Sequence, residues 1–154
     1  MALKVGDKAP AFTMDSDSGG KVKLSDFKGK TLVLYFYPKD DTPGCTKEAC
    51  GFRDSYASLK RQGVAVLGVS KDTAASHDKF KAKYKLPFSL GSDAEIEVAK
   101  AYGVWVKKMN YGREYMGMER STFLIDGKGV IREIWRGVKV NGHVEAVMEA
   151  IKAL

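Results

Sequence analysis

Two nearly continuous apolar runs, residues 31–37 and 64–69, lie on either side of a helix-compatible stretch. The first run ends abruptly at Pro38, and runs of this kind are typical of central strands that are covered on both faces. The stretch between them has apolar residues at spacings of three and four, which form one helical stripe: Ala49, Phe52, Tyr56 and Leu59. A strand, a helix and a second strand in this order predict parallel strands joined by a crossover helix.

The rest of the chain predicts a mixed sheet. Residues 11–24 predict a β-hairpin, residues 24–29 a short helical turn capped by Ser25, and residues 107–118 a long loop. Further helices are predicted over residues 73–85, 94–102 and 142–154, and further strands over 87–90, 121–125 and 130–136. We therefore expect one α/β domain over residues 1–154. Its plan is thioredoxin-like, with a mixed central sheet flanked by helices and an N-terminal β-hairpin.

The cysteine content and the absence of export signals bear on where the protein works. No apolar run approaches the roughly 20 residues that a membrane helix needs, and residues 1–7 lack the apolar core of a secretory signal. We therefore expect a cytoplasmic protein with no membrane partner. Structural disulfides are rare in the cytosol, so the two cysteines, Cys45 and Cys50, indicate catalysis or redox sensing.

The formal net charge of +7 would suit an acidic partner such as nucleic acid. However, the lysines are scattered, and their densest group, residues 79–85, has the pattern of the solvated face of an amphipathic helix. No recognition motif accompanies that group, so we expect no nucleic-acid partner. DNA binding through the basic surface stays open as an alternative, and salt-dependent retention on DNA would reveal it.

Cys45 lies at the start of the helix that follows the predicted strand over residues 31–37. The first N–H groups of a helix have no intrahelical acceptor, and together with the helix dipole they stabilise negative charge. A cysteine in this position is favoured as the thiolate, which is the nucleophilic form. Thr42 precedes Cys45 by three residues, so one turn could bring its hydroxyl near the sulfur. The position therefore predicts a reactive thiol.

The spacing of Cys45 and Cys50 restricts how they can act together. In a regular helix their Cα atoms are about 8.6 Å apart, whereas a disulfide requires less than about 7 Å. A bond between them would require the first turns of the helix to unwind. Three other interpretations stay open: a metal site, although His77 and His143 lack ligand spacing; a dithiol exchanger, although the pattern is not C-x-x-C; and inert buried cysteines.

A family resemblance rests on two motifs. Pro38, Thr42 and Cys45 stand in the pattern Pro, three residues, Thr or Ser, two residues, Cys, which resembles the active-site motif of peroxiredoxins. Residues 35–54, with Cys50 among them, resemble the bacterioferritin-comigratory or Q-type branch. Residues 120–126 are similar to the second motif of that branch, and residues 6–12 to its opening segment. The resemblance spans essentially the whole chain, without a departure in either motif.

The resemblance implies an enzyme, a thiol-dependent peroxidase that reduces hydrogen peroxide and organic hydroperoxides to water and alcohols. Cys45 would be the peroxidatic nucleophile that becomes a sulfenic acid, and Cys50 the resolving cysteine of an intramolecular Cys45–Cys50 disulfide. Arg120 would hold the thiolate and polarise the peroxide, Thr42 would hydrogen-bond both, and Pro38 would shield the sulfenate. Thioredoxin or a glutaredoxin-like dithiol protein would recycle the enzyme. No cofactor or metal is implied, and we expect a monomer, with a dimer left open.

A second hypothesis is a redox-regulated binding protein or holdase. There the disulfide would melt the helix after Cys45 and expose its apolar stripe. A peroxidase consumes many equivalents of peroxide and such a sensor only one, so turnover separates the two.

Other polar and aromatic residues receive structural interpretations. We expect His77 and His143 to face solvent on their helices and Glu48 to be a first-turn charge that suits the helix dipole. Trp105 and Trp135 are expected to pack in the core or on the sheet.

Overall fold

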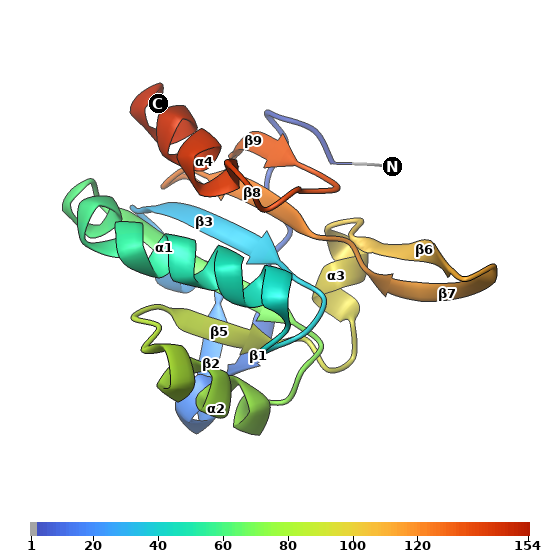
Figure 1. Ribbon diagram of the computed structural model, residues 1–154. Coiled ribbons are helices and arrows are strands. Elements are labelled where there is room, and N and C mark those ends of the chain that lie inside the picture. Colours follow the sequence, from blue (N-terminus) through green and yellow to red (C-terminus); the bar gives the residue numbers. More distant parts are fainter. Residues whose placement is uncertain (1–2) are drawn as a thin grey trace.

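The computed structural model describes residues 3–154 as helices packed on a mixed β-sheet (Figure 1); Met1 and Ala2, which begin the predicted domain, lie outside the described residues. The strands are β1 (Thr13–Ser16), β2 (Lys21–Lys23), β3 (Thr31–Phe36), β4 (Val64–Ser70), β5 (Ser89–Ser92), β6 (Trp105–Asn110), β7 (Arg113–Met118), β8 (Ser121–Ile125) and β9 (Ile131–Trp135). The helices are α1 (Pro43–Arg61), α2 (Ala74–Tyr84), α3 (Glu97–Ala101) and α4 (His143–Lys152), with short 3₁₀ helices η1 (Asp17–Gly19) and η2 (Leu24–Phe27).

The main sheet has the strand order β2-β1-β5-β4-β3-β8-β9. Its centre, β3, pairs in parallel with β4 and antiparallel with β8, so that Phe36 lies opposite both Val69 and Ser121. The N-terminal hairpin of β1 and β2 extends the sheet through an antiparallel pairing of β1 with β5. This topology confirms the predicted mixed sheet with an N-terminal hairpin, and it brings the C-terminal end of β3 beside the start of β8.

Two apolar layers cover β3, because successive side chains of a strand point to opposite faces. One layer contains Leu32, Leu34 and Phe36 and packs against residues of α3; the other contains Val33 and Tyr35 and packs against α1, α2 and α4. All five of these strand side chains are fully buried. Figure 1 shows α1 lying across β3 on this second face. The apolar run of β3 after Thr31 therefore reflects burial on both sides, as predicted.

The prediction of a long loop over residues 107–118 is wrong. Those residues belong to a two-stranded hairpin, β6 and β7, which projects from the body of the molecule (Figure 1). Tyr111 and Gly112 form its turn, both with positive φ, as a two-residue hairpin turn requires. Neither strand joins the main sheet, and most of their side chains are exposed. The pattern of buried and exposed residues that announces a strand is therefore absent from this segment.

The predicted cap of the turn at residues 24–29 is also wrong. Asp26, rather than Ser25, provides the capping side chain, because its carboxylate accepts the Lys23 N–H at 2.9 Å. The predicted helices and the other strands are present, with boundaries that differ by a few residues.

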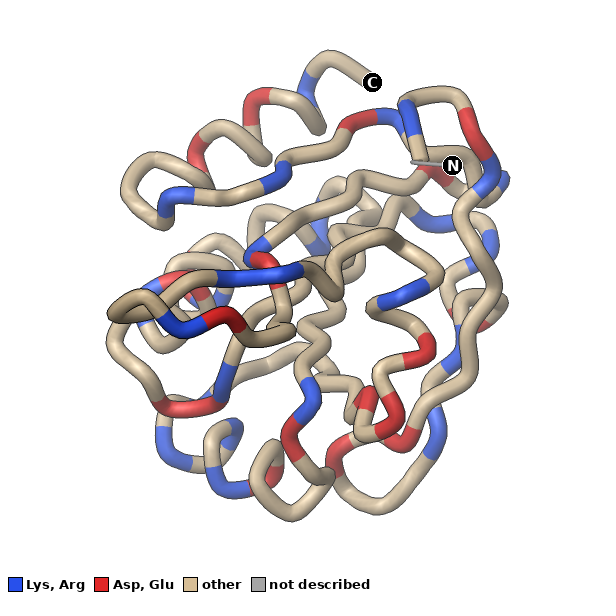
Figure 2. The backbone as a smooth tube through the Cα atoms, turned by 90° about the vertical axis from the view of Figure 1, so that its right-hand side faces the viewer, with Lys and Arg blue, Asp and Glu red and all other residues tan. Residues whose placement is uncertain are grey.

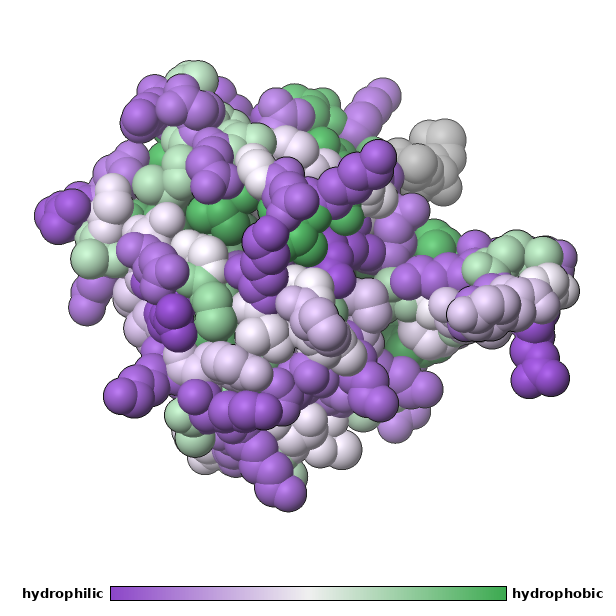
Figure 3. Space-filling model, viewed as in Figure 1, coloured by the Kyte–Doolittle hydropathy of each residue, from purple (hydrophilic) through white to green (hydrophobic). Residues whose placement is uncertain are grey.

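The surface carries charge of both signs. Figure 2 shows basic and acidic positions interspersed along the chain. On the face seen in Figure 3, hydrophobic residues form small patches within a mostly hydrophilic surface. In α2, Lys81 and Lys83 pair with Asp17 and Asp41, while Phe80 is buried. The basic segment 79–85 is thus the outer face of an amphipathic helix, as predicted. Among residues 3–154, none of the helices has the length and apolarity to cross a membrane.

Candidate active site

The junction between β3 and α1 presents Cys45 in the first turn of the helix. Thr42 is the N-cap residue and Pro43 occupies the first helical position, where the missing proline N–H costs no hydrogen bond. The first helical bond runs from the Thr46 N–H to the Thr42 carbonyl at 2.8 Å. The N–H groups of Gly44 and Cys45 precede that bond, so they contribute to the positive end of the helix. This placement of Cys45 is the one that the sequence predicted.

Arg120 reaches the cysteine from the other side of the junction. It immediately precedes β8, whose register with β3 brings residue 120 beside the loop that leaves β3. Its Nη2 donates to Cys45 Sγ at 3.3 Å. Cys45 is only 2% exposed, so little solvent competes for this contact. The guanidinium therefore places a fixed positive charge beside the sulfur.

Gly44 makes room for this contact. A Cβ on residue 44 would lie 3.1 Å from Arg120 Nη2, which is tighter than ordinary van der Waals contact. A side chain at residue 44 would therefore displace the guanidinium from its present position.

Glu48 holds the other end of the Arg120 guanidinium. Its Oε1 accepts from Arg120 Nη1 at 2.8 Å, and its carboxylate is fully buried. Burial raises the pKa of Glu48 to about 7, although Arg120 acts to lower it. Conversely, burial alone would lower the pKa of Arg120, but the negative charges of Glu48 and Cys45 outweigh it and raise that pKa. Arg120 is thus held between a carboxyl group and the reactive thiol.

His143 closes the buried side of this cluster. Its Nε2 lies 2.8 Å from Thr122 Oγ1 and 3.9 Å from Glu48 Oε2. Burial, with Arg120 as a second cause, lowers the pKa of His143 to about 4, so the ring is neutral near pH 7. Because the His143 ring is neutral, the positive charge beside the Glu48 carboxylate comes from Arg120.

The structure places the other predicted residues around the same junction. Thr42 is half-buried, and its hydroxyl donates to the Lys39 carbonyl at 2.9 Å, which leaves its lone pairs as acceptors. Pro38 is exposed two residues after the end of β3. Cys50 is half-buried in α1, and both cysteines are free thiols. Since both lie within one continuous helix, they are in the separated arrangement that the helix geometry predicts.

Three buried polar residues were assigned the wrong environment from the sequence. His77 and His143 are buried rather than solvent-facing, and Glu48 is a buried residue beyond the first turn of α1 rather than a first-turn charge. Helical spacing contained a signal for each, because residues three, four or seven apart share a helix face. Glu48 is three residues after Cys45, His77 is three before Phe80, and His143 is four before Val147.

Comparisons with known proteins all point to the same family. The model of the AhpC/TSA family matches residues 5–134. The peroxiredoxin Bcp of Bacillus subtilis is 52% identical, over 99% of this chain and 97% of its own length. The peroxiredoxin Bcp of Escherichia coli is 42% identical, over 97% of this chain and 96% of its own length.

Solved structures give the same result. A PrxQ mutant from Xylella fastidiosa superposes with a TM-score of 0.94 at 39% identity, over 99% of this chain and 98% of its own. The bacterioferritin comigratory protein of Xanthomonas campestris, studied for its alkyl peroxide reduction activity, superposes with a TM-score of 0.88 at 41% identity, over 92% and 90% of the two chains. The thioredoxin-like fold is therefore confirmed.

Proposed function

Because this chain belongs to the AhpC/TSA family and is a Bcp-type peroxiredoxin, a thiol peroxidase, we propose that Cys45 is its nucleophile and Cys50 its resolving thiol. The substrates are hydrogen peroxide and organic hydroperoxides, in keeping with the alkyl peroxide reduction named for the Xanthomonas campestris relative. The resulting Cys45–Cys50 disulfide is reduced by thioredoxin or a similar dithiol protein.

The contact between Arg120 Nη2 and Cys45 Sγ, 3.3 Å at the N-terminus of α1, is the observation that carries this proposal. The Cys45 thiolate attacks one peroxide oxygen, the S–O bond forms, and the O–O bond breaks. The leaving oxygen takes up a proton as water or alcohol, while Cys45 becomes a sulfenic acid. Negative charge builds on the leaving oxygen, and a guanidinium already held in position stabilises it without reorganisation.

Thr42 and Pro38 complete the peroxide site. The Thr42 hydroxyl gives its proton to the Lys39 carbonyl, so towards the substrate it acts as an acceptor. A peroxide O–H is a donor that fits this acceptor, and the hydrogen bond would hold the oxygen that carries this hydrogen, which becomes the sulfenic oxygen, against the sulfur. Pro38, which is exposed two residues after the end of β3, covers the mouth of the site and limits access of water to the sulfenic acid.

The second step requires a change of conformation. In an intact helix the Cα atoms of Cys45 and Cys50 are about 8.6 Å apart, and a disulfide needs less than about 7 Å. The first turns of α1 therefore unwind before the Cys50 thiolate attacks the sulfenic sulfur. The S–S bond then forms as the S–O bond breaks, and the sulfenic hydroxyl group leaves and takes up a proton to become water.

Intact-mass spectrometry after one equivalent of peroxide tests this scheme. The unchanged protein should lose two hydrogen atoms. Cys50→Ser should instead gain one oxygen atom at an unchanged rate, and it should lose steady-state turnover with a thioredoxin system. Cys45→Ser should show neither mass change nor turnover. Normal peroxide consumption by Cys45→Ser would rule the proposal out.

We further propose that the protein is a monomer in the cytoplasm. The two free thiols suit a reducing compartment, and hydrophobic surface in the view of Figure 3 is limited to small patches. Sedimentation of the reduced protein at micromolar concentration tests the monomer, and a sedimenting dimer would contradict it.

A further inference from the structure

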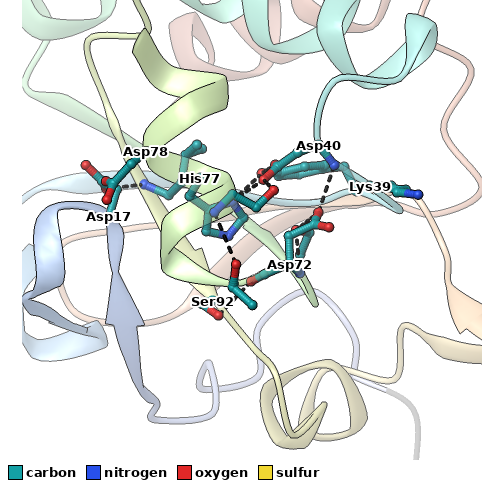
Figure 4. A network of polar contacts seen from close by, with 12 residues as sticks. Asp17, Lys39, Asp40, Asp72, His77, Asp78 and Ser92 are labelled. Atoms are coloured by element: carbon teal, nitrogen blue, oxygen red, sulfur yellow. Dashed lines mark hydrogen bonds and ion pairs between the residues drawn. The ribbon is translucent and has the colours of Figure 1, made fainter. Parts of the chain in front are cut away.

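A buried polar cluster lies directly beneath the loop that joins β3 to Cys45 (Figure 4). At its centre is Asp40, whose carboxylate accepts from three side chains of the chain around it. Tyr37 Oη donates to Oδ1 at 2.6 Å, Ser76 Oγ donates to Oδ2 at 2.8 Å, and His77 Nδ1 lies 2.7 Å from Oδ2. The mechanism proposed above uses none of these groups.

His77 is held as a cation. Its side chain is fully buried, and its second nitrogen, Nε2, lies 2.9 Å from the Gly91 carbonyl. A carboxylate and a carbonyl both accept, so each ring nitrogen must donate, and only the protonated imidazole can do so. Although burial alone would lower it, the pKa of His77 is raised by Asp40, the Gly91 carbonyl and Asp72. Asp40 and His77 thus form a buried ion pair between the loop and α2.

The backbone on either side of Asp40 is also tied down. The Tyr37 N–H donates to the Val69 carbonyl at 3.0 Å and the Asp40 N–H to Asp72 Oδ2 at 2.7 Å. Asp41 has positive φ, and its carboxylate accepts from Lys83 and Tyr84 of α2. The chain therefore enters the active-site loop from a fixed point, only five residues before the cysteine.

We propose that His77 is a positioning residue for the peroxide step. Through Asp40 it fixes the turn that presents Pro38 and Thr42 to Cys45. It does not contact the sulfur itself. This inference rests on the proposed role of Cys45.

The same geometry separates the two chemical steps. Attack on peroxide needs the loop and the first turn of α1 in the folded arrangement shown here. Disulfide formation needs the segment from Cys45 to Cys50 to unwind, whereas Asp40 precedes that segment and is held by residues of α2, which contact β5 through His77 and the Gly91 carbonyl. Loosening the cluster therefore slows the first step and leaves the second step as fast as before.

His77→Gln tests the proposal, since glutamine can retain a hydrogen bond but not the charge. Rapid acid quench and intact mass follow the oxygen-bearing form in the Cys50→Ser background and the disulfide form with Cys50 present. We expect the peroxide step to slow by about tenfold or more, because a misplacement of catalytic groups by a fraction of an ångström lowers the rate by about this factor. Disulfide formation should not slow. Alkylation of Cys45 by iodoacetamide should slow in parallel with the peroxide step.

Two further variants separate positioning from general loss of stability. Lys81→Met removes a different ion pair of α2, with Asp17 at 2.7 Å, away from the loop, and should leave both rates unchanged. Asp40→Asn combined with His77→Gln should be no slower than the worse single variant, because His77 acts through Asp40. Should His77→Gln fail to fold, Ser76→Ala removes one donor to Asp40 and should slow the peroxide step by about twofold to threefold.

Unchanged peroxide kinetics in the folded variants would overturn the proposal. Equal slowing of both steps, an equal loss in Lys81→Met, or fully multiplicative losses in the double variant would do the same. Failure of the scheme for Cys45 and Cys50 is recognised separately, because the protein with His77 intact would then not lose two hydrogen atoms on reaction with peroxide.

Discussion

Replacing Glu48 by glutamine should remove a specific pH dependence from the stability of the protein. Burial raises the pKa of Glu48 from the ordinary 4.5 to about 7. The folded protein therefore holds a proton that the unfolded chain releases. The stabilisation associated with this carboxyl group is fully present below pH 4.5, and it is lost as the pH rises through about 7.

The size of the effect follows from the gap between the two pKa values. Each pKa unit corresponds to about 1.4 kcal/mol, so the full loss is about 3 kcal/mol, of which roughly 2 to 3 kcal/mol falls between pH 5 and pH 8. Glutamine has the same shape and can still accept from Arg120 Nη1 through its amide oxygen, but it does not titrate. Its stability profile should therefore be flatter by that amount.

Urea unfolding of the reduced proteins at several pH values between 5 and 8 measures the difference. His77 and His143 also titrate, but both are present in each protein, so subtracting the two profiles isolates Glu48. Glu145→Gln removes an exposed carboxylate of α4 and is the control for loss of one negative charge. If the Glu48→Gln profile runs parallel to that of the unchanged protein, the buried carboxyl is not the titrating group and this reasoning is wrong.

Three substitutions near the site and in the core extend these expectations. Arg120→Lys should slow the peroxide step by about 100-fold, because an ammonium group cannot contact Cys45 with the fixed fork of a guanidinium; single-turnover quench measures it, and a loss under threefold would count against the role of Arg120. Gly44→Ala should also slow that step, since its Cβ would lie 3.1 Å from Arg120 Nη2, while urea unfolding should show no loss of stability, because alanine is favoured over glycine in a helix. Gly68→Ala should cost about 1–3 kcal/mol of stability, because its Cβ would lie 2.7 Å from the buried Tyr35 ring; an unaltered urea midpoint would contradict this.

The main sheet was predictable because its strands carry strong local signals. The runs of β3 and β4 are almost entirely apolar because both faces are covered, and the stripe of α1 repeats with helical spacing. The β6–β7 hairpin was not predictable in this way. Its strands bury few side chains on either face, so their sequence lacks the alternation of apolar and polar residues that distinguishes a strand from a loop. Only the turn at Tyr111 and Gly112 carried local information.

The candidate site was predictable in its motif residues but not in its buried supports. Cys45 and Arg120 were expected to meet because both stand in recognisable motifs, and the structure places them 3.3 Å apart. The environments of Glu48 and His77 depend on partners distant in sequence, Arg120 and Asp40 respectively. Helical spacing assigns such residues to the inner face of a helix, but only the tertiary structure shows which charge they meet there.

The pairing of β3 with β8 determines where the chain can gain or lose residues without separating Arg120 from Cys45. Residues 62–119 separate α1 from Arg120, yet the guanidinium meets the sulfur because Phe36 lies opposite Ser121 in the sheet. Extra residues at the tip of the β6–β7 hairpin would leave that alignment untouched. Deleting one residue within β8, by contrast, would turn the rest of the strand over and draw Arg120 away from its partner. Longer and shorter versions of this protein are thus compatible with the same chemistry as long as β3 and β8 keep their register.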